Sequence, residues 1–173
     1  MQNSLRITFL LGLLSLAVVF DIDARHEFKQ SQKLLQKTLA NHAVLLHQTL
    51  NYHWNVEGKE FYDYHLLFDK EYHILFENLD LIAERIRAVG GKVQASMKHF
   101  IDNASIKEDN GATPHPKDMV KRLHDQYHRI VEDMRKAVKD LEKSGDVATR
   151  KMLEDLIEMH EKTQWMLKSL LKK

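Results

Sequence analysis

The sequence lacks cysteine entirely and has only two prolines and six glycines among its 173 residues. Without cysteine, the chain has no disulfides, no thiolate nucleophile and no cysteine-ligated zinc or iron–sulfur centre. Hydrophobic residues at 43% and charged residues at 29% are typical of a folded helical protein rather than a disordered one. The formal charge of +1 gives no general attraction to nucleic acid. The length suffices for one domain with a hydrophobic core.

The first 24 residues differ in composition from the rest of the chain. Arg6 precedes an apolar run of 14 residues, 7–20. That run is shorter than the roughly 20 residues that span a bilayer, but it fits the roughly 7–15 residues of a signal-peptide core. A weak small-residue cleavage site at Ala24 precedes Arg25. We therefore expect an export signal over 1–24, a folded domain over 25–173 and no stable membrane span. The alternative is a cytoplasmic protein with an N-terminal extension.

Apolar residues recur at helical spacing in four long segments, and alternating strand patterns are absent. The predicted helices cover 30–56, 60–89, 116–143 and 147–171. Gly58, Gly90-Gly91 and Pro116 mark their ends. The inner stripes are expected to comprise Leu35, Leu39, Leu46 and Leu50; Met119, Leu123, Tyr127, Ile130 and Met134; and Met152, Leu156, Met159 and Met166. A long crossover over 92–115 carries a short helical piece. We predict an all-α fold, a four-helix bundle with the single long crossover of ferritin-like proteins.

One face of the second predicted helix is unexpectedly polar. His65, Asp69, Asp80 and Glu84 fall within an arc of roughly 100° on that helix, and His53 lies shortly before it. We expect this face to be the seam of the bundle, where such groups are costly to bury unless they are paired or metal-bound. Imidazole and carboxylate ligands without thiolates suit iron, manganese or zinc.

The spacing of these residues prevents one chain from joining all of them around one metal. Asp69 and Asp80 lie about 16 Å apart along the helix axis, and His65 and Glu84 about 28 Å. The two pairs are, however, symmetric about the point between residues 74 and 75. An antiparallel crossing of the helix with its copy would place His65 opposite the second Glu84 and Asp69 opposite the second Asp80. Such a two-fold interface would create two equivalent metal sites.

A di-iron centre inside one bundle normally uses Glu-x-x-His motifs on facing helices. None of the twelve glutamates in this sequence has a histidine three residues later. The spacing therefore disfavours an in-bundle centre and favours a site shared between subunits.

Several motifs together resemble the Dps family of ferritin-like mini-ferritins over residues 30–173. They are NYHWNVEG (51–58), FYDYHLLFD (61–69), NLDLIAERIRAVGGK (78–92) and, more weakly, FIDNASIKE (100–108). The resemblance implies a hollow dodecamer built from two-fold dimers. It implies a ferroxidase that binds Fe(II), oxidises it preferentially with hydrogen peroxide and stores Fe(III) mineral. It assigns His53, His65 and Asp69 of one subunit, with Asp80 and Glu84 of its two-fold mate, to the metal site.

Two neighbours of these residues are accessory candidates. Trp54 resembles the family tryptophan near the site and is a candidate electron donor, with interface packing as the alternative. His73 is a candidate supplementary ligand, with an exposed or hydrogen-bonded histidine as the alternative. His124 and His128, four residues apart on the third predicted helix, are interpreted as a surface pair.

Two other functions are compatible with the sequence. The first is a DNA-compacting stress protein with an incidental metal site. DNA-binding members of the family usually contact phosphate through lysine-rich tails, whereas residues 25–33 are modestly basic and include Glu27. The second is a non-iron metal sink that holds zinc or manganese without turnover.

Overall fold

A computed structural model of the chain describes residues 28–172, so the predicted export signal over 1–24 lies outside the described residues. Five helices make up the described region and no strand occurs in it: α2 (Lys29–Asn55), α3 (Phe61–Ala88), α4 (Met97–Asn103), α5 (Pro116–Leu141) and α6 (Val147–Leu171). Each of the four long helices begins and ends within about two residues of its predicted boundaries. The all-α prediction is confirmed. Between residues 28 and 172, none of the helices is long and apolar enough to cross a membrane.

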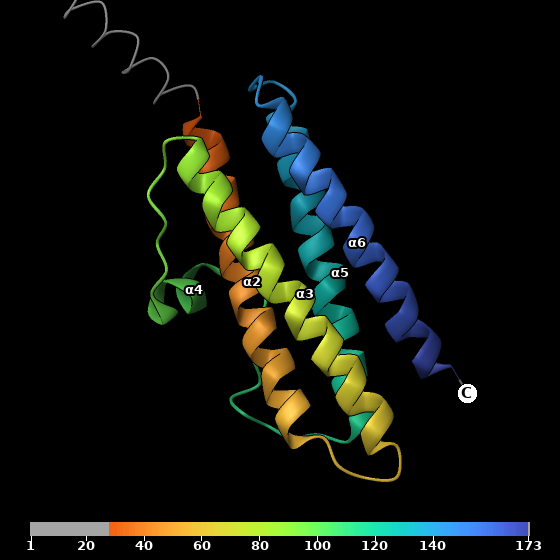
Figure 1. Cartoon of the computed structure of the whole chain (residues 1–173). Helices are drawn as coiled ribbons and strands as arrows, with labels where there is room; N and C mark the ends of the chain where they lie inside the picture. Colours follow the sequence, from red (N-terminus) through yellow and green to blue (C-terminus); the bar gives the residue numbers. More distant parts are fainter. Residues whose placement is uncertain (1–27, 173) are drawn as a thin grey trace, which may run out of the picture.

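The four long helices form a bundle of two hairpins (Figure 1). Helix α2 packs along α3, α5 packs along α6, and α2 also contacts α5. The connection from α3 to α5 runs along the outside of the bundle and carries α4 against α2. The predicted bundle with one long crossover and a short crossover helix is therefore confirmed.

Local sequence signals explain where the long helices end. Gly58 and Gly90 adopt positive φ values of 114° and 77°, which favour glycine, just outside α3. Pro116 begins α5, where its missing N–H costs no helical hydrogen bond. The Asp146 side chain accepts a hydrogen bond from the Thr149 backbone N–H and thereby caps α6.

Helix α3 faces the core with Tyr64, Phe68, Leu75, Ile82 and Ile86, all of them buried. The predicted inner stripe of α5 is confirmed at every position, since Met119, Leu123, Tyr127, Ile130 and Met134 are buried. In α2 the stripe is confirmed at Leu35, Leu39 and Leu46, and Leu50 is half-buried. In α2 and α5, the buried positions are therefore largely those that apolar periodicity predicted.

The inner stripe predicted for α6 is largely wrong. Met159 is exposed, and Met152 and Met166 are only half-buried. The buried residues of α6 are instead Thr149, Leu153, Leu156, His160, Thr163 and Leu167. The stripe includes two threonines and a histidine, so apolar periodicity alone misplaces it.

Several polar side chains inside the bundle have specific partners. His42 on α2 donates from Nδ1 to the Thr38 carbonyl at 2.8 Å, which leaves its Nε2 to accept from His160 Nε2 at 2.9 Å. Both rings are fully buried, and burial lowers the pKa of His42 to about 4 and that of His160 well below its ordinary value. On α3, the buried Glu71 accepts a hydrogen bond from the Tyr127 hydroxyl at 2.9 Å. The bundle interior therefore contains a neutral histidine pair.

This histidine pair predicts acid sensitivity. The unfolded chain protonates His42 near pH 6.5, whereas the folded chain does so only near pH 4. Between these pH values, the unfolded state binds a proton on His42 that the folded state does not bind. The free energy of unfolding is therefore highest above about pH 6.5 and falls as the pH decreases to 4. The expected loss from His42 is about 3 kcal/mol. Urea unfolding at pH 7.5 and 4.5 measures this loss.

His42→Gln, which accepts a hydrogen bond but does not titrate, should reduce the difference in free energy of unfolding between the two pH values. An unchanged difference would show that His42 is not the source of the acid sensitivity.

Candidate metal centre

The end of α2 and the first turns of α3 hold two histidines against each other. His53 Nδ1 lies 3.1 Å from the His65 carbonyl oxygen, and His65 Nδ1 lies 2.9 Å from the His53 carbonyl oxygen. The two rings are stacked, with centroids 3.9 Å apart. This reciprocal pairing fixes the orientation of both rings across the loop that contains Gly58.

The hydrogen bonds also determine which ring nitrogen of each histidine is left to bind a metal ion. A carbonyl oxygen only accepts, so Nδ1 carries the hydrogen in both His53 and His65. In the neutral imidazoles, each Nε2 therefore presents a lone pair. Histidines that bind metals are commonly oriented in this way by a hydrogen bond from the other nitrogen.

Asp69 lies one turn after His65 and completes this group of side chains. Its Oδ1 is 3.9 Å from His53 Nε2. Two ligand atoms, each about 2.1 Å from one ion, can be at most about 4.2 Å apart, so this spacing is compatible with a shared ion. His73 Nδ1 donates to the Asp69 carbonyl at 2.8 Å and lies 3.7 Å from its carboxylate. His73 is thus exposed and hydrogen-bonded, and it lies beside the candidate ligands.

Aromatic side chains surround the histidines. Phe61 stacks on His65 with centroids 4.9 Å apart, and Tyr72 lies 5.1 Å from His53 and 4.2 Å from His73. Burial and the neighbouring Asp69 carboxylate raise the pKa of the Tyr72 phenol, which therefore remains protonated. Trp54 follows His53 and is 69% exposed. The aromatic surroundings partly shield the histidines, while the Trp54 indole projects from the surface of the single chain.

Asp80 and Glu84 lie on the same face of α3 but further along it. Both are exposed, and Asp80 is about 16 Å from Asp69 along the helix axis. Within residues 28–172, no three histidine, aspartate or glutamate side chains converge closely enough to hold a metal ion. The structure thus places His53 beside His65 and 3.9 Å from Asp69 without closing the three around one point, and it leaves Asp80 and Glu84 apart from them.

The expectation that this polar face forms the seam of the bundle is wrong. The buried residues of α3 lie roughly 145° around the helix from the centre of the His65–Glu84 arc. His65 and Asp69 are half-buried, and the exposed Phe76 lies among them on the outer face. The polar side chains avoid the cost of burial inside the bundle because they point outward. The candidate ligands therefore occupy an outer surface of the subunit.

Comparisons with known proteins agree with this architecture. A family model described as a ferritin-like domain matches residues 32–173. The chain is 37% identical to an uncharacterized low temperature-induced protein of Nostoc sp., over 80% of this chain and 78% of that protein. It is 33% identical to the DNA protection during starvation protein 2 of Bacillus anthracis, over 83% and 97%. The chain belongs to the Dps family of ferritin-like proteins.

A solved structure extends the family assignment to the fold. The crystal structure of the Dps protein from Vibrio cholerae O1 matches with a TM-score of 0.82 and 29% identity, over 86% of this chain and 92% of that one. That protein is described as a member of a broad superfamily of ferritin-like diiron-carboxylate proteins. Membership of the Dps family places this chain broadly among proteins of iron storage and protection against oxidative stress.

Sequence reasoning about this Dps chain missed the groups that orient the candidate ligands. The carbonyls of His53 and His65 carry no side-chain signal, and their role depends on how α2 meets α3. The buried His42–His160 pair was also missed, because the two residues lie 118 positions apart. The contact between Tyr72 and His53 likewise depends on how α2 meets α3, and no sequence pattern marks it.

Proposed function

We propose that this Dps protein is a ferroxidase whose sites are each completed by two subunits. His53, His65 and Asp69 of one subunit would bind Fe(II) together with Asp80 and Glu84 of a second copy. The observation that carries the proposal is the division of the ligand set into two half-sites on the outer surface, one where the end of α2 meets α3 and one further along α3. One half-site has two oriented histidines, with a carboxylate 3.9 Å from His53, and the other presents two exposed carboxylates at symmetric positions.

The proposed reaction uses hydrogen peroxide as the oxidant. Two Fe(II) ions give one electron each to hydrogen peroxide, which takes up two protons and yields two Fe(III) ions and two waters. Delivery of both electrons avoids release of hydroxyl radical. The carboxylates offset the charge of the iron, and the neutral histidines bind it through Nε2. The Fe(III) product would be stored as mineral inside a dodecamer built from two-fold dimers.

The surface charges favour protection by iron oxidation over protection by coating DNA. Basic and acidic residues are nearly balanced, at 26 and 25. Several basic side chains on α4, α5 and α6 are paired with acids one turn away, as in Lys98–Asp102, Lys121–Asp125 and Lys151–Asp155. A carboxylate that pairs with a lysine competes with DNA phosphate for that lysine, and DNA binding requires lysine or arginine side chains that phosphate can neutralise. The proposed protective effect is removal of Fe(II) and peroxide together.

We also propose that the protein acts outside the cytoplasm after removal of residues 1–24. The support is the charged flank and the apolar run of signal-peptide length. Sequencing the mature N-terminus from the native host should find Arg25. A retained Met1 would contradict export.

The proposed activity is tested by adding peroxide to the Fe(II)-loaded protein without oxygen. Ferric absorbance should rise until two Fe(II) ions are consumed per peroxide, with little hydroxyl radical reaching a spin trap. A metal sink would show no protein-dependent oxidation, and uncontrolled Fenton chemistry would produce trapped radical at nearly one radical per peroxide. Either result would overturn the proposal. A gel shift with DNA at modest salt, expected to be negative, tests the DNA-compacting alternative in the same preparation.

A further inference from the structure

Met159 on α6 combines an accessible thioether with a hydrogen-bond donor on the neighbouring helix. It is 38% exposed, so hydrogen peroxide can approach the sulfur from solvent. Asn78 on α3 donates from Nδ2 to Met159 Sδ at 3.5 Å. Of the methionines between residues 28 and 172, Met159 alone has a sulfur that accepts a hydrogen bond. Oxidants commonly convert accessible methionines to sulfoxides, and Met159 is an accessible methionine with a donor already in place.

The Asn78 amide has a poor partner in this sulfur. Asn78 is 4% exposed, so water has little access to it. A thioether has no hydrogen to donate and is only a weak acceptor. A buried donor with a weak acceptor loses more from dehydration than it regains from the contact. A stronger acceptor in place of the sulfur would therefore tighten the contact between α3 and α6, which belong to different hairpins of the bundle.

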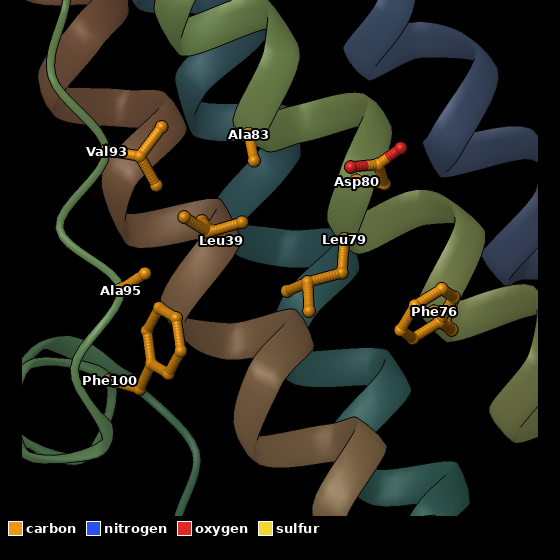
Figure 2. Close-up of a pocket in the computed structure, with 8 residues that line it drawn as sticks. All are labelled: Leu39, Phe76, Leu79, Asp80, Ala83, Val93, Ala95 and Phe100. Carbon is orange, nitrogen blue, oxygen red and sulfur yellow. The ribbon is translucent and has the colours of Figure 1, made fainter.

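The two-fold pairing proposed for α3 leaves Met159 accessible. That pairing uses the face of α3 that carries Phe76 and Asp80, beside an apolar pocket formed with α2 and the crossover (Figure 2). Asn78 lies two residues before Asp80 and is therefore about 160° around the helix from it. Met159, which contacts Asn78, is thus on the side of α3 away from the pairing face. The sulfur therefore stays open to solvent when two copies pair in this way.

We propose that Met159 is a site of oxidation by hydrogen peroxide and that its sulfoxide tightens the contact between α3 and α6 through Asn78. Peroxide transfers one oxygen atom to Sδ: the O–O bond breaks, an S–O bond forms, and the other oxygen leaves as water with both hydrogens. The sulfur is oxidised by two electrons and the peroxide is reduced by two. Rotation about the flexible methionine side chain lets the new, polar oxygen accept from Asn78 Nδ2. This modification goes beyond the proposed ferroxidase and requires no iron.

Hydrogen–deuterium exchange with peptide mass spectrometry tests this inference on the iron-free, assembled protein. After peroxide treatment, the peptide with Met159 should gain one oxygen, whereas those with the buried Met119 and Met134 should not. Backbone amides of α6 around Met159 should then exchange roughly five-fold more slowly, the effect of one added hydrogen bond. Met97 on α4 is 51% exposed and provides the control, because its oxidation should not slow exchange in α4.

Two variants test the part played by the Asn78 amide. Asn78→Leu removes the donor, so oxidation of Met159 should then speed exchange in α6, as a sulfoxide without a partner disrupts packing. Met159→Gln places an amide oxygen near the same point and should slow exchange without peroxide, a result that does not depend on the folding of Asn78→Leu.

Two results in the parent protein would overturn the proposal. The first is a Met159 that stays unoxidised while Met97 gains oxygen. The second is an oxidised Met159 with unchanged or faster exchange in α6. Because the measurement contains no iron, rejection of the ferroxidase would leave this proposal intact, and rejection of this proposal would leave the ferroxidase intact.

Discussion

The double variant His65→Ala, Asp69→Ala is expected to oxidise Fe(II) with peroxide at least about 100-fold more slowly than the parent protein. Loss of residues that merely support metal ligands costs about 10–100-fold in metal affinity, and this change removes two proposed ligands. It also removes the ring that stacks on His53 at 3.9 Å, whereas the hydrogen bond from His53 to the backbone carbonyl of residue 65 is retained. Stopped-flow ferric absorbance at fixed protein and iron concentrations measures the effect.

A matched pair on α5 provides the control for this variant. His124 Nδ1 and Asp125 Oδ1 lie 3.1 Å apart on the surface, far in sequence from the proposed site. His124→Ala with Asp125→Ala removes the same two residue types and should leave the oxidation rate near that of the parent. Equal rates in both double variants would show that the assignment of His65 and Asp69 is wrong.

The double variant Asp80→Asn, Glu84→Gln should lose at least about 100-fold as well. Both substitutions preserve side-chain size and remove the anionic ligands that Fe(II) prefers. Within one chain these residues lie too far along α3 to share an ion with His65 and Asp69. A large effect therefore requires a second copy to bring them to the histidines. Glu77→Gln, at an exposed glutamate on the same helix, should have little effect on the rate.

Retention of the parent rate by Asp80→Asn, Glu84→Gln would contradict the shared site even if the histidine half-site proved essential. Size-exclusion chromatography of this variant distinguishes loss of ligands from loss of assembly. Because both residues are exposed, the fold of the subunit should be unaffected, and circular dichroism should match that of the parent.

The helices could be predicted closely from the sequence because their ends carry strong local signals. Gly58, the Gly90-Gly91 pair and Pro116 each act through backbone conformation, which depends little on the rest of the fold. The inner face of α6 could not be predicted in the same way. His160 and Thr163 are buried there, and the partner of His160 is on α2. Periodicity of apolar residues does not reveal such a pairing.

The candidate site could likewise be predicted only in part from the sequence. The spacing of His65, Asp69, Asp80 and Glu84 along one helix could be read from the sequence, because helix geometry fixes which residues share a face. Whether that face points inward or outward depends on how α3 packs against α2, and the sequence-based expectation of a bundle seam was wrong. The orientation of His53 and His65 depends on two carbonyl groups, which no residue type marks.

Co-assembly of the two inactive double variants tests directly whether two subunits share each metal site. In dimers formed at random from equal amounts, half of the dimers contain one copy of each variant. Each mixed dimer regains one intact site of its two, with the histidines from one chain and the carboxylates from the other. A site shared between subunits should therefore restore about one quarter of the parent oxidation rate. Mixed assemblies of the correct size that oxidise Fe(II) no faster than the two variants alone would contradict a site shared between subunits.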